Sequence, residues 1–182
     1  MKHLYCALAL TAMSLGLGAC STDSSSDMPT GMITRNDFEN TQGWGGANEP
    51  TVTTEKAHSG KYSITVNPQY EFSHTYIRTL GQMTGGKPKK MTVTAWAWVP
   101  DKESTAVIVV DIKHSPENGA QVFYETLDLV PAVQEFKAWR KVSKTFNLPD
   151  SIASTNQCKV YLWRGSSPRP VFVDDVSIEV EN

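Results

Sequence analysis

Residues 90–100 read KMTVTAWAWVP, and this stretch has the side-chain period of two that is typical of a β-strand. Apolar residues occupy every second position from Met91 to Val99. The positions between them hold Thr92, Thr94, Trp96 and Trp98. Because successive side chains of a strand point to opposite faces, the stretch predicts a strand whose Ala95 and Ala97 face lies on a core.

Similar strand patterns recur along the chain and alternate with turn signals. TAVIVVDIKH (105–114), KVYLWRG (159–165) and VFVDDVSIEV (171–180) are short and rich in β-branched residues. Between the runs lie NPQ, TGGKPKK, PENG, LPD and GSSPRP. We count about nine or ten short strands and no amphipathic helix of three turns, without an internal repeat or a second domain. The pattern predicts an all-β fold, a two-sheet antiparallel β-sandwich.

The first twenty residues, MKHLYCALALTAMSLGLGAC, have the pattern of a secretory signal. The apolar run from Leu4 to Leu17 has no charged residue and is shorter than the roughly 20 residues of a membrane span. Its ending, LGAC, resembles the lipobox of bacterial lipoproteins, in which the signal is cut before the cysteine and the thiol is lipidated. The alternative is an ordinary signal that is cut at an alanine.

The lipobox interpretation divides the chain into three parts. We expect a signal peptide at 1–19, a lipidated Cys20 with a flexible Ser-rich tether at 20–32, and one domain at 33–182. Ser21 replaces the Asp that would resemble an inner-membrane retention signal, which favours the outer membrane of a bacterial cell envelope. After cleavage and lipidation Cys158 is the remaining free thiol, so no intrachain disulfide is expected and Cys158 is interpreted as a core residue.

Charge and motifs argue against two classes of function. The chain has 17 basic and 19 acidic residues and no basic stripe, so no nucleic-acid partner is expected. It contains no His-Glu-x-x-His, no Gly-x-Ser-x-Gly and no phosphate-binding Gly loop. Asp111 and Glu125 have the chemistry of a glycosidase pair, but no sequence signal selects them. We therefore predict that the protein is not an enzyme.

Two adjacent carboxylates, Asp174 and Asp175, interrupt the last predicted strand. Simple alternation places Asp174 on the core face with Phe172 and Val176, and Asp175 on the opposite face. A carboxylate among apolar side chains is costly unless something pairs with it. The alternatives are a metal ion, a buried hydrogen-bond network, and solvent at an edge strand.

The order of six short motifs makes the resemblance to a known family specific. DFEN…GW (37–44), AHSGKYSITV (57–66), MTVTAWAWV (91–99) and AWRKVSKTFNLP (138–149) are followed by KVYLW and VFVDDVSIEV. This order resembles the jelly-roll carbohydrate-binding modules of families four, nine and twenty-two, which are galactose-binding-domain-like. The resemblance spans about Asn36 to Val180. It implies a jelly-roll sandwich that binds a glycan.

The resemblance also implies a structural Ca²⁺ site. In that family the opening Glu, the carbonyls of a Ser-Gly turn and the final Asp pair assemble the site. Carried over by position, the ligands are Glu39, the backbone of Ser59 and Lys61, and Asp174 or Asp175. Calcium suits such a set because it takes six to eight oxygen ligands. The alternative is that Asp174 accepts backbone N–H groups and Asp175 is solvated.

Aromatic residues provide the candidate glycan contacts, because sugar faces stack on Trp and Tyr rings. Trp96 and Trp98 form an outward platform if the alanine face is the core side, and Tyr161 and Trp163 repeat the pattern near Arg164. Core packing is the alternative for each ring. The predicted ligand-binding residues are Trp44, Trp96, Trp98, Tyr124, Tyr161, Trp163 and Arg164.

The functional prediction is non-catalytic binding of a glycan or polysaccharide by a cell-envelope lipoprotein. Its expected partners are the glycan, the membrane through Cys20, and an envelope protein. The alternative is a structural or protein-interaction surface lipoprotein, an adhesin or assembly part, that uses the same fold without binding sugar. Exposure of Trp98 and Trp163 on one concave face would favour the sugar.

Overall fold

The computed structural model describes residues 30–40, 43–45, 49–116 and 119–182. The predicted signal peptide, Cys20 and most of the predicted tether lie outside these residues. Within the described ranges, no helix has both the length and the apolar character needed to cross a bilayer.

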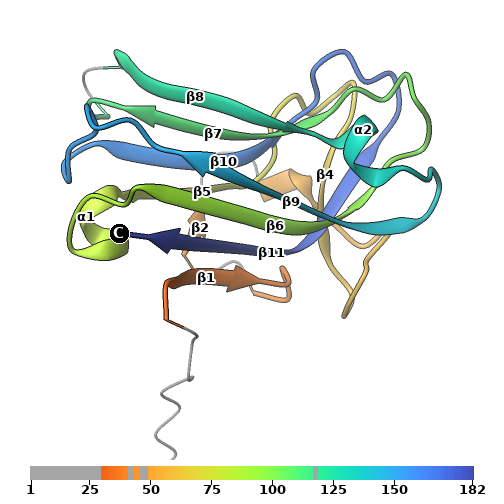
Figure 1. Ribbon diagram of the computed structural model, residues 1–182. Coiled ribbons are helices and arrows are strands. Elements are labelled where there is room, and N and C mark those ends of the chain that lie inside the picture. Colours follow the sequence, from red (N-terminus) through yellow and green to blue (C-terminus); the bar gives the residue numbers. More distant parts are fainter. Residues whose placement is uncertain (1–29, 41–42, 46–48, 117–118) are drawn as a thin grey trace, which may run out of the picture.

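Two antiparallel sheets form the domain, which confirms the predicted all-β sandwich (Figure 1). The first sheet has the order β3 (Val52–Thr53), β4 (Ser63–Val66), β11 (Val171–Glu181), β6 (Lys90–Trp98) and β9 (Trp139–Asn147), and β1 (Met32–Asn36) also pairs with β11. The second sheet has the order β2 (Trp44–Gly45), β5 (Thr75–Thr79), β10 (Gln157–Trp163), β7 (Val107–Lys113) and β8 (Gln121–Asp128).

Helices are confined to single turns in the described part of the chain. The 3₁₀ turn η1 spans Glu49–Thr51, α1 spans Leu80–Thr84, and α2 spans Leu129–Val133. Thr79 caps α1, since its side chain accepts from Gln82 N–H while the Gln82 side chain accepts from Thr79 N–H. The α1 turn carries the chain from β5 to β6 and α2 carries it from β8 to β9, so both cross between the sheets.

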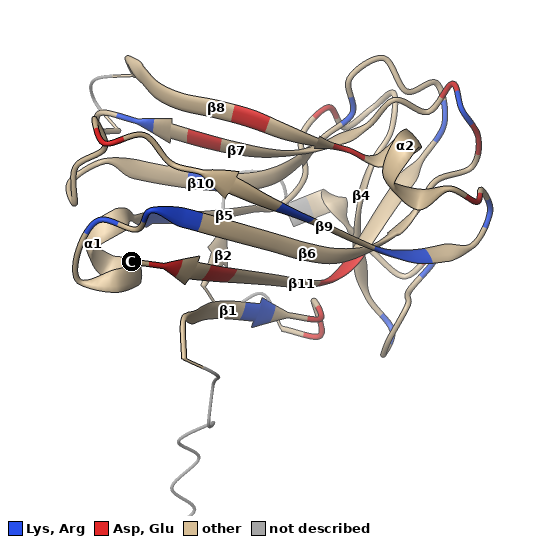
Figure 2. Cartoon of the chain, viewed as in Figure 1, with Lys and Arg blue, Asp and Glu red and all other residues tan. Residues whose placement is uncertain are grey.

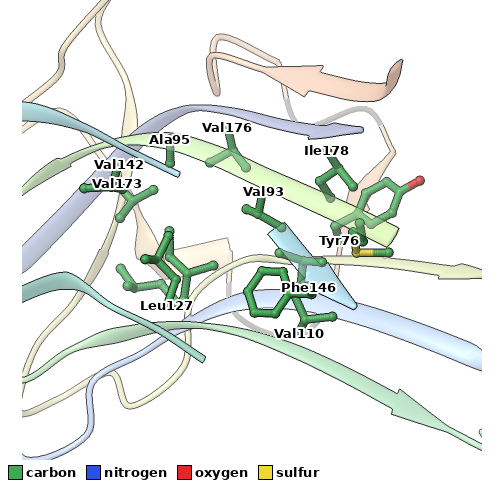
Figure 3. Packing of buried hydrophobic residues seen from close by; sticks show 14 of the residues in the cluster. Tyr76, Val93, Ala95, Val110, Leu127, Val142, Phe146, Val173, Val176 and Ile178 are labelled. Carbon is green, nitrogen blue, oxygen red and sulfur yellow. The ribbon is translucent and has the colours of Figure 1, made fainter. Parts of the chain in front are cut away.

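The alternation of β6 confirms the predicted core face. All five apolar positions from Met91 to Val99 are fully buried, whereas Trp96 and Trp98 point to the other side and are only partly buried. Figure 3 shows Val93 and Ala95 of β6 facing the second sheet, with Val110 of β7 and Leu127 of β8 opposite them. We call the side of each sheet that faces this core its inner face, and the other side its outer face.

Cys158 lies on the inner face of β10 and is a free, buried thiol, as predicted. Burial raises the pKa of this thiol from 9.0 to about 12, and the negative charge of Asp111 contributes. A thiol that stays protonated at neutral pH is a poor nucleophile, so Cys158 acts as a core residue.

Candidate functional site

A β-bulge in the last strand determines where the two adjacent carboxylates point. β11 pairs with β6 as Asp174↔Trp96 and then as Ser177↔Thr94, so Asp175 and Val176 oppose one residue of β6. Asp175 has φ of 48°, a left-handed conformation that Asp tolerates better than most residues. The bulge reverses the alternation of the strand at this point.

The predicted position of Asp174 on the core face is therefore wrong. Val173 and Val176 both belong to the core cluster, whereas Phe172 and Asp174 lie on the outer face with their partners Trp98 and Trp96. Asp174 is nevertheless 0% exposed, because the segment around His58 and Ser59 covers it. Burial beneath this loop, rather than in the core, explains why the carboxylate needs partners.

Hydrogen bonds from the loop and from the Asp175 N–H group satisfy both carboxylates. Asp174 Oδ2 accepts from the backbone N–H groups of His58 (2.7 Å) and Ser59 (3.1 Å), and Asp174 Oδ1 accepts from Asp175 N–H (2.7 Å). Asp175 Oδ1 accepts from Ser59 Oγ (2.9 Å), and Asp175 Oδ2 lies 2.6 Å from His58 Nδ1. We call this network the loop latch.

The loop latch opposes the cost of burying Asp174 without removing it. Burial raises the pKa of Asp174 above its usual value of 3.8, and the three backbone N–H groups lower it. The charge of Asp175 adds a smaller upward effect. The alternative in which Asp174 accepts backbone N–H groups matches this geometry, whereas the solvated Asp175 of that alternative does not.

The carboxylates among the predicted calcium ligands already have hydrogen-bond partners within the chain. Every oxygen of the Asp174 and Asp175 pair accepts from an N–H or O–H group, and Glu39 Oε1 accepts from the N–H groups of Lys61 (2.6 Å) and Tyr62 (2.8 Å). A cation would instead need oxygen lone pairs pointing at it. In the described residues, no three His, Cys, Asp or Glu side chains gather closely enough to hold a metal ion. Structural Ca²⁺ at this site stays a prediction that rests on the resemblance.

Gly60 explains why the loop can approach Glu39 so closely. Its φ is 56°, and a Cβ at this position would collide with the Glu39 carboxylate. The predicted Ser-Gly turn thus serves to present N–H groups to carboxylates. It connects the start of the domain, at Glu39, to β11 at its end.

The same loop covers the predicted tryptophan platform on the first sheet. The His58 ring stacks on Trp96 with centroids 3.8 Å apart, and Lys56 Nζ lies 4.5 Å from the Trp98 ring centroid. Trp98 also packs edge-on against Phe172. Trp96 and Trp98 do point outward, as predicted, but their rings are occupied by residues of the chain itself.

Trp44 lies in the core, and Arg164 lies in a turn. Trp44 is 6% exposed and packs between Phe38 and Tyr76, at centroid distances of 5.3 and 5.6 Å. Arg164 Nη1 donates to the carbonyl of Ser167 and so holds the turn after β10. Neither residue joins the other predicted ligand contacts, since Trp44 is buried in the core and Arg164 is held in the turn after β10.

The outer face of the second sheet carries the other predicted aromatics. Residues that are paired across antiparallel strands share a face. One row runs across four strands and contains Ile77, Lys159, Asp111 and Tyr124. The next row contains Tyr161, Val109 and Thr126, and the third contains Trp163, Val107 and Asp128, with Phe72 bridged to Trp163. We call these three rows the Asp111 face.

Aromatic rings border this face on two sides and remain accessible. Phe72 is 42% exposed and lies edge-on to Tyr161 at 5.8 Å, while Tyr124 on β8 is 40% exposed. Trp163 Nε1 donates to Glu71 Oε1 at 3.2 Å, which fixes the orientation of its ring. Trp98 of β6 and Trp163 of β10 lie on different sheets, so they do not form the single concave face that would have favoured the sugar.

Asp111 lies in the middle of this face and is 5% exposed. Its Oδ2 lies 3.5 Å from Lys113 Nζ, and its buried Oδ1 has no hydrogen-bond partner among the described residues. Figure 2 shows the acidic segment within β7 and the basic one at the end of the strand. Burial, with the charges of Asp111 and Tyr124 contributing, raises the pKa of Tyr161 to about 12, and burial and Asp111 also raise the pKa of Tyr124. Both phenols therefore stay neutral at physiological pH.

Glu125 cannot act with Asp111 as a glycosidase pair in this geometry. It is opposite Val110, so it points to the side away from Asp111, where its Oε2 lies 3.1 Å from Lys144 Nζ. Asp111 and Phe72 were not among the predicted ligand contacts. The sequence could have indicated Asp111, because it is an acidic residue inside the β-branched run of β7. By strand alternation it lies on the same face as Val107 and Val109.

Comparison with known proteins agrees with this architecture. The family model described as Carbohydrate binding domain (CBM_4_9) matches residues 30–170. No curated protein matches the chain. The C-terminal family 22 carbohydrate binding module of Clostridium thermocellum Xyn10B is similar in structure, with a TM-score of 0.57, 15% identity, and coverage of 84% of this chain and 94% of that one.

Two further solved structures have the same fold. The CBM22-1 xylan-binding domain of Paenibacillus barcinonensis Xyn10C has a TM-score of 0.54 at 16% identity, with coverage of 84% of this chain and 97% of that one. A family 16 carbohydrate binding module has a TM-score of 0.53 at 17% identity, with coverage of 80% and 97%. At these identities the likeness concerns the fold alone, whereas the family match extends over most of the sequence. The chain belongs to the carbohydrate binding domain family.

Proposed function

We propose that this domain binds a polysaccharide without catalysis, through the Asp111 face. The observation that carries the proposal is the accessible set of rings, Phe72, Tyr161, Trp163 and Tyr124, around a polar centre on one sheet. Rings of this kind stack on the apolar faces of sugars while polar groups bind the hydroxyls. Family membership and the xylan-binding description of a structural neighbour support the same function.

The outer face of the first sheet is a weaker candidate for the same role. Its tryptophans already contact His58 and Lys56, so a ligand would have to displace the loop latch. The rings of the Asp111 face are partly open without any such rearrangement. We therefore assign Trp96 and Trp98 to the stability of the domain.

A glycan microarray with the protein from Ser21 onward tests the proposal. We expect saturable binding to one class of polysaccharide, lost in Trp163→Ala and Tyr124→Ala but retained in Glu179→Ala, an exposed substitution on the first sheet. Absence of binding across plant, algal, host and peptidoglycan glycans by folded protein would overturn it and favour the protein-interaction role.

We also propose that a lipid on Cys20 anchors the domain to the bacterial cell envelope at the outer membrane. The LGAC ending of the predicted signal supports this proposal. A tether of about a dozen residues has an end-to-end distance of roughly 20 Å, enough to let the domain reorient above a membrane. Labelling with a radioactive fatty acid should mark the wild-type protein and leave Cys20→Ala unlabelled. Equal labelling of both proteins would contradict the anchor.

A further inference from the structure

Glu71, in the segment between β4 and β5, contacts two consecutive residues at the end of β10. Its backbone carbonyl accepts from Arg164 N–H at 2.9 Å. Its side-chain Oε1 accepts from Trp163 Nε1 at 3.2 Å. Glu71 itself is exposed, whereas Trp163 is partly buried. One residue therefore holds both the backbone after Trp163 and the indole ring of Trp163.

The neighbouring residue, Phe72, pairs with Trp163 across an antiparallel bridge. Ser73 N–H donates to the carbonyl of Leu162 at 3.0 Å, and Leu162 N–H donates to Ser73 Oγ at 3.0 Å. In an antiparallel bridge that hydrogen bonds flank in this way, the two paired side chains lie close together on one face. These bonds fix the backbone beneath both rings. They leave the indole of Trp163 able to turn about its own side-chain bonds.

The carboxylate of Glu71 restrains that rotation. The indole Nε1–H is the single polar group of a tryptophan side chain and is a donor only. A hydrogen bond from it to a carboxylate is charge-assisted, so it is stronger than a bond between neutral groups. Because the contact is made at the edge of the indole, it does not use the ring faces that stack on a sugar.

We infer that Glu71 is a positioning residue for glycan binding and that it holds the Trp163 indole in a fixed orientation before the ligand arrives. Fixing a mobile side chain during binding costs affinity, and a ring that is held in advance avoids part of this cost. The inference rests on the proposed function. It adds to that function a residue that acts through Trp163 and not through contact with the glycan.

Two alternatives give Glu71 a different role. In the first, Glu71 accepts a hydroxyl group of the glycan directly. In the second, its bond to Trp163 is a surface contact without effect on binding. Trp163→Phe separates the first alternative from positioning, because phenylalanine keeps an aromatic face but has no N–H for Glu71 to hold. A positioning effect of Glu71 disappears in this background, whereas a direct contact remains.

Isothermal titration calorimetry with xylohexaose and cellohexaose, on the protein from Ser21 onward, measures these effects. Glu71→Ala should weaken binding about twofold to tenfold, which is the cost of fixing one side chain on binding. Glu71→Gln keeps an acceptor oxygen for the indole N–H and should stay within about twofold of the wild type. Gln69→Ala, which truncates another exposed side chain of the same segment, should bind like the wild type. In the Trp163→Phe background, Glu71→Ala should cause no further loss, and a second loss equal to the first would overturn the inference in favour of direct contact.

Nuclear magnetic resonance of the tryptophan indole N–H groups reports the contact itself. The chain has five tryptophans, and the signal of Trp163 is the one that Trp163→Phe lacks. This signal should move in Glu71→Ala and stay near its wild-type position in Glu71→Gln. An unmoved signal in Glu71→Ala would overturn the inference, and so would a moved signal with unchanged affinity.

The same titrations distinguish a failure of this inference from a failure of the proposed function. If the wild-type protein binds a hexaose and Glu71→Ala binds it equally well, the positioning role alone is wrong. If the wild-type protein binds neither hexaose nor any glycan of the microarray, the proposed function falls, and the positioning role falls with it.

Discussion

The substitution Asp174→Ala tests how strongly the loop latch stabilises the domain. It removes the carboxylate that accepts from the N–H groups of His58, Ser59 and Asp175. Each hydrogen bond to a charged group contributes about 1.5–3 kcal/mol, so the three together give about 4.5–9 kcal/mol before the cost of burial. Burying a carboxylate costs several kcal/mol, and the raised pKa of Asp174 shows that this cost persists in the folded protein. We therefore expect a net loss of about 3 kcal/mol in the free energy of unfolding.

Circular dichroism during heating measures this loss. For a domain of this size 1 kcal/mol corresponds to about 2–4 °C, so the melting midpoint of Asp174→Ala should fall by about 6–12 °C. Guanidinium unfolding should give the same free-energy difference with an unchanged slope. Glu179→Ala, which removes an exposed carboxylate from the same strand, should stay within about 0.5 kcal/mol of the wild type.

Asp174→Asn separates lost hydrogen bonds from lost volume. The two side chains have nearly the same size, but the amide has one acceptor oxygen and one NH₂ group. Because both oxygens of Asp174 accept from N–H groups, the NH₂ faces a donor whichever way the amide is turned. We expect this variant to be destabilised by at least half as much as Asp174→Ala. A midpoint shift no larger than that of Glu179→Ala in both variants would refute the assignment of the latch.

Four other measurements test the same structure. His58→Ala should lower the free energy of unfolding by about 1–2 kcal/mol, since it removes the side-chain partner of Asp175 and the ring stacked on Trp96; no change would show that the stack is incidental. EDTA should leave the midpoint unchanged, because the carboxylates are already satisfied by N–H groups; a lower midpoint restored by Ca²⁺ would support the metal. The stabilising contribution of the buried Tyr76 hydroxyl and Cys158 thiol should be fully present below about pH 9 and be lost toward pH 12, since their pKa values are raised to about 12 in the folded protein and they release protons earlier when unfolded; flat alkaline stability would contradict this. Trp98→Ala should lower the stability of the domain and leave glycan affinity unchanged. Trp163→Ala should lower glycan affinity and leave stability unchanged.

Local alternation was sufficient to predict the sandwich and the core face of β6. Each side chain of that strand lies on the inner or the outer face according to whether its residue number is odd or even. The sequence KMTVTAWAWVP is therefore enough to predict the inner face. The same rule failed at Asp174, because the extra residue of the bulge reverses the face to which each preceding side chain of β11 points. Asp175 takes the positive φ of the bulge, a conformation that Asp adopts more readily than most residues.

The role of each aromatic residue could not be predicted from the sequence in the same way. Whether an outward ring is open depends on what covers it, and the loop that covers Trp96 is held by residues 115 to 117 positions away in the chain. Strand periodicity contains no information about such distant contacts. The separation of Trp98 and Trp163 onto different sheets likewise depends on the pairing of β6 with β11 and of β10 with β7.

The two outer faces show how similar sequence patterns can serve different purposes. Each face has aromatic residues at alternate positions and a buried carboxylate beside them, Asp174 on the first sheet and Asp111 on the second. On the first sheet, all the oxygens of the acidic pair have donors from the chain, so nothing remains for a ligand to complete. On the second sheet, Asp111 Oδ1 lacks a donor among the described residues, although this costs stability. The two buried carboxylates are therefore compensated in different ways: Asp174 by N–H groups of the chain, and Asp111 by the charge of Lys113 near its Oδ2.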